Sequence, residues 1–210
     1  MTIKVVLFDL DNTLIDRQKM FRQMLMNKIG EYHNGNVEEI VDEIIDWDNK
    51  GNQNRLEVFK KYVDKYQPNV SADELNAYWD ENSGKIVCIY EDAYETLSYL
   101  KDKYRLGIVS NGNSVSQRRK VNQLPFLDLF EFTIISGEFG INKPDVRIFD
   151  HVAKEMGVKN NECAFVGDNF RCDIEGATNA GMLPIWRCSK EQFDNRYICI
   201  EELSELKKYL

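Results

Sequence analysis

The sequence has few of the features that mark exported, membrane-bound or metal-thiolate proteins. No run of about 18 apolar residues occurs, and we expect neither a membrane-spanning helix nor a membrane partner. The first residues lack the pattern of a signal peptide, because Asp9 interrupts their short apolar stretch. The five cysteines form no Cys-x-x-Cys pair and no Cys/His metal pattern, so we expect reduced thiols in a cytoplasmic protein.

Basic residues are also in deficit, with 27 lysines and arginines against 35 aspartates and glutamates and a formal net charge of -8. Because no basic stripe offsets the excess of acid, we expect no nucleic-acid partner. A site for a small anion would need a metal ion or a few well-placed cations.

The pattern of apolar residues predicts an α/β protein with a doubly wound parallel sheet. Residues 4–8, KVVLF, are a short β-branched run typical of a buried strand. From about residue 86, helical segments alternate with strands, which is typical of a parallel sheet with helices on both faces. The expected strands of this part are 105–110, 132–136, 162–167 and 183–187, and the expected helices are 91–104, 114–123, 146–157 and 171–181.

The segment between the first strand and this alternating part has a different texture. Four stretches carry apolar residues three and four positions apart, which predicts amphipathic helices. Ser71 followed by Glu74 has the capping-box pattern of a helix start. We therefore expect a core domain of residues 1–16 and 86–210 and an inserted helical domain of residues 17–85.

Several polar and aromatic residues have a structural interpretation. Acids near helix starts and turns are usually caps or solvated residues, and we expect this of Asp16, Asp46 and Asp48. Solvated helix faces are expected for Arg17, Lys19, Arg22 and Arg55. His33 and His151 are interpreted as structural or surface residues, and Trp47 and Trp79 as core residues of the helical domain.

Polar residues follow three of the expected strands where each strand ends. Asp9 and Asp11 follow the first strand, Ser110 ends the second, and Asp168 follows a later one. In open parallel sheets ligands bind outside the carboxyl ends of the strands, so these side chains should converge. Asp9 and Asp168 then form an oxygen-rich anionic pocket that suits Mg²⁺.

Cations and hydroxyls near this pocket indicate a site for a phosphoryl group. Lys143 can add a positive charge, and Ser110 with the backbone N–H groups of residues 111–113 can bind an anion at a helix start. A metal ion, an ammonium group, a hydroxyl and a helix N-terminus together suit phosphoryl chemistry.

The sequence resembles the haloacid dehalogenase superfamily of hydrolases, in the form with a helical cap inserted after the first strand. The resemblance spans residues 3 to about 187. Four motifs carry it in order: Asp9, Asp11 and Thr13 as D-x-D-x-T, the strand-terminal Ser110, Lys143 before Pro144, and Gly167, Asp168 and Asp173 as G-D-x-x-x-x-D.

The resemblance implies a role for each matching residue. Asp9 is the expected nucleophile, which becomes an aspartyl phosphate, and Asp11 is the expected acid–base. The expected Mg²⁺ ligands are the side chains of Asp9 and Asp168 and the backbone carbonyl of Asp11. Thr13, Ser110 and Lys143 are expected to hold the phosphoryl oxygens or the nucleophile, and Asp173 should orient Lys143 or metal-bound water. Asn111 and Gly112 are expected to bind the substrate together with Thr13.

The expected activity is Mg²⁺-dependent hydrolysis of a small phosphorylated metabolite, such as a sugar phosphate or a nucleotide monophosphate. Asp11 favours phosphate monoesters over haloacids, because a halide leaving group needs no proton. Two alternatives stay open: a phosphomutase of the same fold, and a regulatory or binding module without catalysis. The oligomeric state is not indicated by the sequence.

Overall fold

The computed structural model describes residues 2–33 and 35–210. These residues divide into two compact units, one formed by residues up to Ile15 together with Ile89–Leu210, and one formed by Asp16–Cys88. The second unit begins one residue before, and ends three residues after, the expected segment 17–85.

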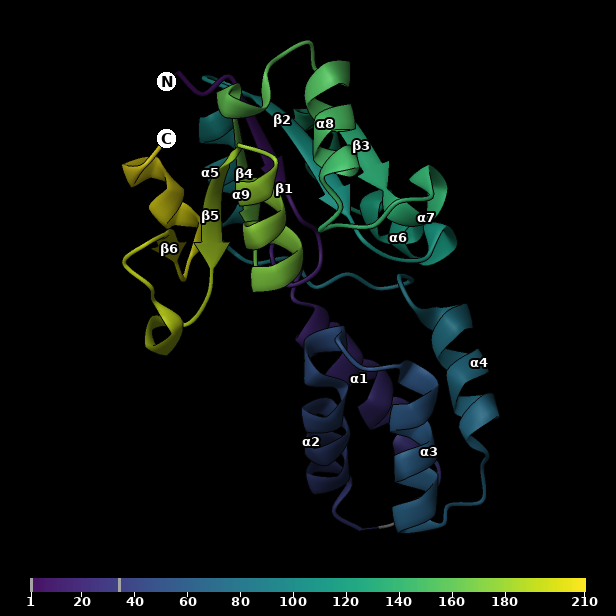
Figure 1. Ribbon diagram of the computed structural model, residues 1–210. Helices are drawn as coiled ribbons and strands as arrows, with labels where there is room; N and C mark the ends of the chain where they lie inside the picture. The colour runs from purple at the N-terminus through teal and green to yellow at the C-terminus, as the bar shows by residue number, and fades with distance from the viewer. Residues whose placement is uncertain (1, 34) are drawn as a thin grey trace. The chain divides into compact units, whose positions relative to one another are not determined.

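The first unit contains a six-stranded sheet in the order β3-β2-β1-β4-β5-β6, and every neighbouring pair is parallel (Figure 1). This confirms the prediction of a doubly wound parallel sheet. The strands are β1 Val5–Phe8, β2 Arg105–Ser110, β3 Phe130–Ile135, β4 Cys163–Gly167, β5 Leu183–Arg187 and β6 Ile198–Ile200.

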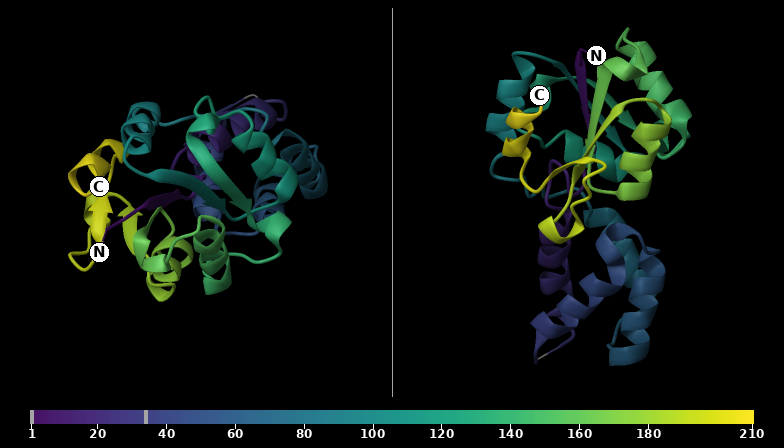
Figure 2. Two further views of the ribbon diagram at one scale, coloured as in Figure 1. Left: turned by 90° about the horizontal axis from the view of Figure 1, so that it is seen from above. Right: turned by 60° about the vertical axis from the view of Figure 1, so that its left-hand side comes forward.

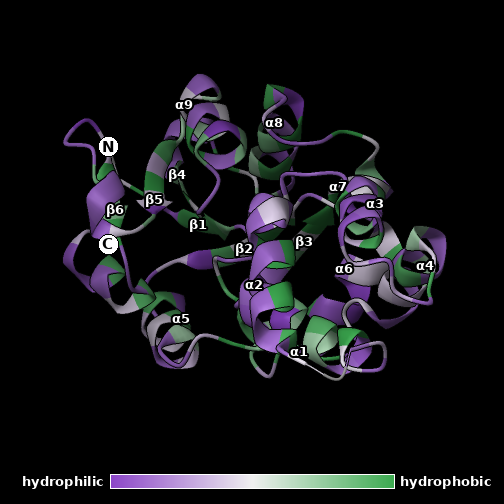
Figure 3. Cartoon of the chain, turned by 90° about the horizontal axis from the view of Figure 1, so that it is seen from below, coloured by the Kyte–Doolittle hydropathy of each residue, from purple (hydrophilic) through white to green (hydrophobic). Residues whose placement is uncertain are grey.

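Helices cover both faces of this sheet. In Figure 3, α8 and α9 lie on one side of the strands and α5 lies on the other. The helices of this unit are α5 Ala93–Lys101, α6 Ser114–Val121, α7 Ser136–Phe139, α8 Val146–Glu155 and α9 Gly176–Asn179, with a π-helical turn at Phe170–Glu175. Short 3-10 helices span Leu127–Leu129, Asn160–Glu162, Lys190–Gln192 and Leu203–Lys208.

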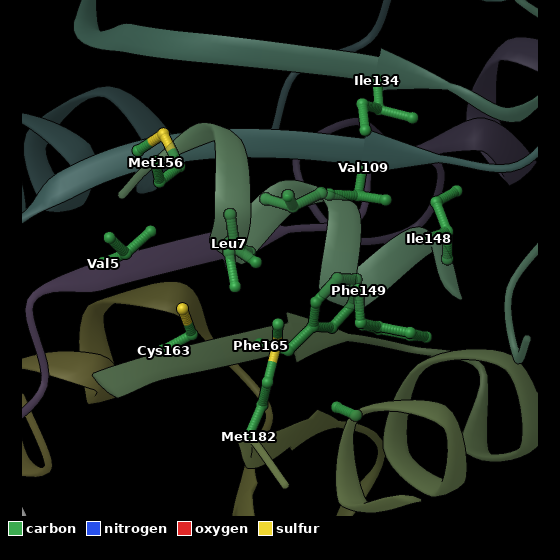
Figure 4. Packing of buried hydrophobic residues seen from close by; sticks show 13 residues of the cluster. Val5, Leu7, Val109, Ile134, Ile148, Phe149, Met156, Cys163, Phe165 and Met182 are labelled. Carbon is green, nitrogen blue, oxygen red and sulfur yellow. The ribbon is translucent and has the colours of Figure 1, made fainter. Parts of the chain in front are cut away.

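The core between the sheet and α8 explains why the first strand is apolar throughout. All four residues of β1 are fully buried, since each face of the sheet is covered. Leu7 on β1 and Phe165 on β4 pack with Phe149 of α8 in one cluster (Figure 4). Full burial of each such side chain stabilises the fold by about 1.5–3 kcal/mol.

The strand order fixes where ligands bind. The chain builds β1, β2 and β3 toward one edge, then returns to place β4 on the other side of β1. This reversal leaves a crevice outside the carboxyl ends of β1 and β4, where ligands bind in sheets of this kind. Asp9 follows β1 and Asp168 follows β4, so both carboxylates lie at this reversal.

Two parts of the first unit differ from the expectations. The edge strand β6 has only three residues, too short for an apolar pattern to be recognised in the sequence. The expected helix 171–181 is divided, because a π-helical turn at Phe170–Glu175 precedes α9.

The regular elements of the second unit, within its described residues 16–33 and 35–88, are all helical (Figure 2). They are α1 Arg17–Ile29, α2 Val37–Asp48, a 3-10 turn at Asn49–Gly51, α3 Arg55–Tyr66 and α4 Ala72–Asn82. The capping box of Ser71 and Glu74 is confirmed at the start of α4, and the side chain of Asp16 caps α1 by accepting from the N–H of Lys19. Trp47 and Trp79 pack against the apolar cluster of this unit, as expected.

Three residues of the second unit are wrongly predicted as solvated. Asp48 is fully buried, and its two carboxylate oxygens lie 2.8 Å from Arg17 and 2.5 Å from Arg55. The side chains of both arginines are nearly buried as well. The Arg55 guanidinium stacks over the rings of Phe21 and Trp79. A buried carboxylate is tolerated here because two cations compensate its charge, and Arg17 also donates a hydrogen bond to it.

The chain leaves the first unit and returns to it at neighbouring positions. Ile15 and Ile89 form an isolated antiparallel bridge, and the N–H of Tyr90 donates to the carbonyl of Leu14. On the side of the second unit, the N–H of Asp16 donates to the carbonyl of Cys88 at 2.7 Å. Among the helices of the described residues, none is both long and apolar enough to cross a bilayer.

Candidate active site

The loop after β1 presents Asp9 at the carboxyl end of the sheet. The N–H of Asp9 donates to the carbonyl of Val166, so the pairing of β1 with β4 continues one residue beyond the strand. Asn12 then takes a left-handed conformation with φ 58°, which turns the chain back. Leu10 and Leu14 are buried beneath this turn. The side chain of Asp9 is therefore held at a fixed place by a short, packed loop.

Lys143 joins Asp9 to Asp173. Its Nζ atom lies 2.7 Å from Oδ1 of Asp9 and 2.7 Å from Oδ1 of Asp173. The backbone of Lys143 is held by the side chain of Asn111, which accepts from its N–H and donates to its carbonyl, both at 2.9 Å. The second oxygen of Asp173 accepts from the N–H of Asn169 at 3.0 Å. Two loop residues, Asp9 and Lys143, and Asp173 of the π-helical turn are thus fixed as one ion-paired cluster.

Burial sets the electrostatics of this cluster. Burial is the main cause that raises the pKa of Asp9 well above its ordinary value, and the nearby charges of Asp173 and Asp168 raise it further against the effect of Lys143. Burial alone would lower the pKa of Lys143, but the carboxylates of Asp173 and Asp9 more than compensate and raise it. The lysine therefore stays charged, while the cluster favours a further cation.

A divalent cation fits the residues that are present. Oxygen atoms of Asp9, Asp168 and Asp173 all lie within 4.8 Å of one another, and two of these carboxylates, Asp9 and Asp173, are ion-paired to Lys143. Carboxylate oxygens are the ligands that Mg²⁺ prefers. The carbonyl of Asp168 accepts from the indole N–H of Trp186 at 2.9 Å, which fixes the start of its loop. Asp9 and Asp168 are the predicted side-chain ligands, and the structure adds Asp173 to their group.

The carboxylate of Asp11 lies against two residues of α6. Nζ of Lys120 is 2.7 Å and 2.8 Å from its two oxygens, and Nε2 of Gln117 is 2.8 Å from Oδ2. Lys120 and Gln117 are both buried. Sequence reasoning missed these residues. The only signal for them is their spacing of three, which places both on one face of the helix that follows Ser110.

The groups expected to bind phosphoryl oxygens differ in whether they already have a hydrogen-bond partner in the protein. Ser110 is buried, and its Oγ accepts from Gln117 at 2.8 Å. The N–H of Gly112 donates to Oγ of Ser136 at 3.0 Å, so it already has a protein partner. The hydroxyl of Thr13 is buried, and within residues 2–33 and 35–210 it has no hydrogen-bond partner.

The start of α6 offers its N–H groups to its own cap. The side chain of Asn113 accepts from the N–H groups of Val115 and Ser116, at 2.9 Å and 3.3 Å. The backbone groups at this helix start are thus partly satisfied within the loop.

Comparisons with known proteins agree with this arrangement. A family model described as haloacid dehalogenase-like hydrolase matches residues 3–181. Glyceraldehyde 3-phosphate phosphatase of Pyrococcus furiosus is 32% identical over 202 residues, which cover 88% of this chain and 80% of that protein. N-acylneuraminate-9-phosphatase of Rattus norvegicus is 26% identical, with 86% and 80% covered. The magnesium-bound structure of YfnB from Bacillus subtilis has a TM-score of 0.81 at 20% identity and covers 100% of this chain and 99% of that one.

Acids lie at the carboxyl ends of the central parallel strands, and a buried lysine lies between two of them. This arrangement is an anionic site that suits a cation. The chain belongs to the haloacid dehalogenase-like hydrolase family. The resemblance drawn from the four motifs is thereby confirmed.

Proposed function

We propose that this chain is a phosphatase that hydrolyses small phosphate monoesters through an aspartyl-phosphate intermediate and requires Mg²⁺. The observation that carries the proposal is the position of Asp9. It directly follows the central strand β1, it is ion-paired to Lys143, and it lies beside the acids Asp168 and Asp173. The names of the two phosphatase relatives support the same reaction.

Asp9 suits the role of nucleophile. The attacking group must be an ionised carboxylate, and burial opposes that ionisation. Lys143 holds one oxygen of Asp9 through its ammonium group and leaves the other oxygen for attack on phosphorus. Asp9, Asp168 and Asp173 would hold the Mg²⁺ ion, which supplies positive charge to the phosphoryl oxygens.

Asp11 suits the role of acid–base. It lies two residues after Asp9, and its own partners are separate from those of Asp9. As the acid it gives its proton to the leaving alcohol oxygen while the P–O bond breaks. As the base it then takes a proton from the water that attacks the aspartyl phosphate. A leaving halide would need no such proton, so Asp11 supports phosphate monoesters as substrates.

The substrates we propose are small sugar phosphates and phosphates of sugar acids. Relatives that act on glyceraldehyde 3-phosphate and on N-acylneuraminate 9-phosphate support this class. We further propose that residues 16–88 act as the cap that selects among them. Their insertion directly after the catalytic loop of β1 supports this role, because it ties the segment to the nucleophile through only a few residues.

Release of inorganic phosphate from a panel of sugar phosphates, sugar-acid phosphates and nucleotide monophosphates tests the proposal. We expect turnover with Mg²⁺ for at least one sugar phosphate, and no turnover for Asp9→Asn with any substrate. Retention of the phosphoryl group on an isomeric sugar would show a mutase instead. A protein that releases no phosphate from any compound, and forms no phosphoenzyme, would contradict the proposal.

A further inference from the structure

We propose that Lys120 and Gln117 are positioning residues that hold the Asp11 carboxylate in place for both proton transfers. The inference rests on the acid–base role proposed for Asp11. It concerns two residues outside the four sequence motifs, on a helix that contributes no residue to them.

Lys120 and Gln117 form a buried binding site for the carboxylate of Asp11. Lys120 reaches both oxygens of Asp11, and Gln117 reaches one of them, all within 2.8 Å. Only 4% of Lys120 and 3% of Gln117 is exposed. An ammonium group is rarely buried to this degree without a fixed counter-ion, and here Asp11 serves as that ion. The pair therefore fixes the side chain of Asp11 more firmly than a surface ion pair does.

Gln117 also ties Asp11 to the nucleophile cluster. Its Nε2 atom lies 2.8 Å from Oγ of Ser110 and 2.9 Å from the carbonyl of Asn111. Asn111 in turn holds the backbone of Lys143, which contacts Asp9. A continuous series of contacts thus runs from the acid–base to the nucleophile. These contacts fix the position of the Asp11 carboxylate relative to that of Asp9, although the two groups need different surroundings.

Lys120 acts on the reaction through Asp11, and Gln117 acts through Asp11 as well as through its contacts with Ser110 and Asn111. When the P–O bond of a substrate breaks, the Asp11 O–H proton goes to the leaving oxygen, and the donors of Lys120 and Gln117 hold the carboxylate that results. In the second step that carboxylate takes a proton from the attacking water. Displacement of the Asp11 carboxylate should slow each step in which a proton is transferred. It should have little effect on a step whose leaving group needs no proton.

The test compares two substrates in rapid-mixing experiments that follow the first turnover and the steady state. Lys120→Met and Gln117→Leu remove the donors, Lys120→Arg keeps a cation, and Arg118→Met removes a cation from the same helix that pairs with Glu138 at the surface. For an alkyl phosphate we expect phosphoenzyme formation to slow by about 10- to 100-fold in the first two variants, with KM little changed. For p-nitrophenyl phosphate the burst of nitrophenol should fall by less than about 3-fold, and the following steady state should be slow.

Two further results complete the test. Lys120→Arg should recover part of the alkyl phosphate rate, and Arg118→Met should match the wild type. Lys120→Met added to Asp11→Asn should cost nothing more, because both changes act on one group. Equal losses for both substrates in folded protein, or full additivity with Asp11→Asn, would overturn the positioning role. A wild-type enzyme that releases neither nitrophenol nor phosphate would instead contradict the proposed function itself.

Discussion

Gly167 lies against the carboxyl group of Asp173, so that a Cβ atom on Gly167 would stand 2.4 Å from the carboxyl carbon. Asp173 is 1% exposed and holds Lys143, and it has no room to withdraw. We expect Gly167→Ala to lower the free energy of unfolding by about 1–3 kcal/mol through overpacking. Activity should fall by about 10²-fold, because Lys143 and Asp9 move with Asp173. Gly35→Ala is the control, since a Cβ there meets nothing within 4 Å.

Substitution of Asp9 and substitution of Asp11 should affect different steps of the reaction. Asp9→Asn removes the attacking oxygen, so no phosphoenzyme should form. Asp11→Asn should lose about 10²–10⁴-fold for substrates with poor leaving groups and much less for an aryl phosphate. It should also accumulate aspartyl phosphate, since water is no longer activated. Rapid-quench labelling and peptide mapping locate the phosphoryl group, and label on Asp11 would reverse the assignment.

Metal removal should abolish turnover. A chelator should leave the acids at Asp9, Asp168 and Asp173 facing the phosphate with Lys143 as their nearest cation, and excess Mg²⁺ should restore activity. Ca²⁺ should support the reaction poorly, because its looser and larger coordination places the phosphate differently. Phosphate release in metal-stripped protein at the full rate would exclude a metal requirement.

The burial of Asp9 should make the metal-free protein less stable as pH rises. A carboxyl group whose pKa is raised by folding stabilises the fold below its unfolded pKa, about 3.9, and this stabilisation is lost as pH rises through the folded pKa. In a chelator, the wild type should therefore lose stability as pH rises above about 4 more steeply than Asp9→Asn, in which Lys143 is still ion-paired to Asp173. Urea unfolding of both proteins at several pH values measures the difference, and parallel curves would contradict it.

Substitution of Asp48 should strongly lower the free energy of unfolding of the second unit. Asp48→Asn leaves Arg17 and Arg55 facing each other without a neutralising charge in a buried place, where burial already lowers the pKa of Arg55 to about 10. Removing one partner of a buried ion pair costs about 3–5 kcal/mol. Tryptophan fluorescence during urea unfolding reports on this unit through Trp47 and Trp79. Asp46→Asn, at an exposed position of the same helix, should change little.

The sheet could be predicted because its physical cause is local in the sequence. A strand buried on both faces must be apolar at every position, and residues 5–8 show this directly. The acids Asp9 and Asp168 could be placed together for a similar reason, since parallel strands bring their carboxyl ends to one edge.

Partners far apart in the sequence could not be predicted in the same way. The run QRRK contains three cations in a row, and only the fold shows that Arg118 reaches the surface while Lys120 meets Asp11. Likewise the pairing of Arg17 with Asp48 joins positions 31 residues apart. A cation looks the same in the sequence whether water or a buried carboxylate neutralises it, so these contacts depend on tertiary packing.

The chain leaves the first unit at Ile15 and returns to it at Ile89, and these two residues are neighbours in the structure. This proximity affects which inserted segments the fold can accept. The ends of the intervening segment are already joined by the bridge between these residues, and all six strands of the sheet lie outside this segment. Lengthening a loop whose ends are fixed costs only about 0.6 kcal/mol per doubling. A different module, longer or shorter and of unrelated fold, can therefore be exchanged at this point while the catalytic strands keep their register.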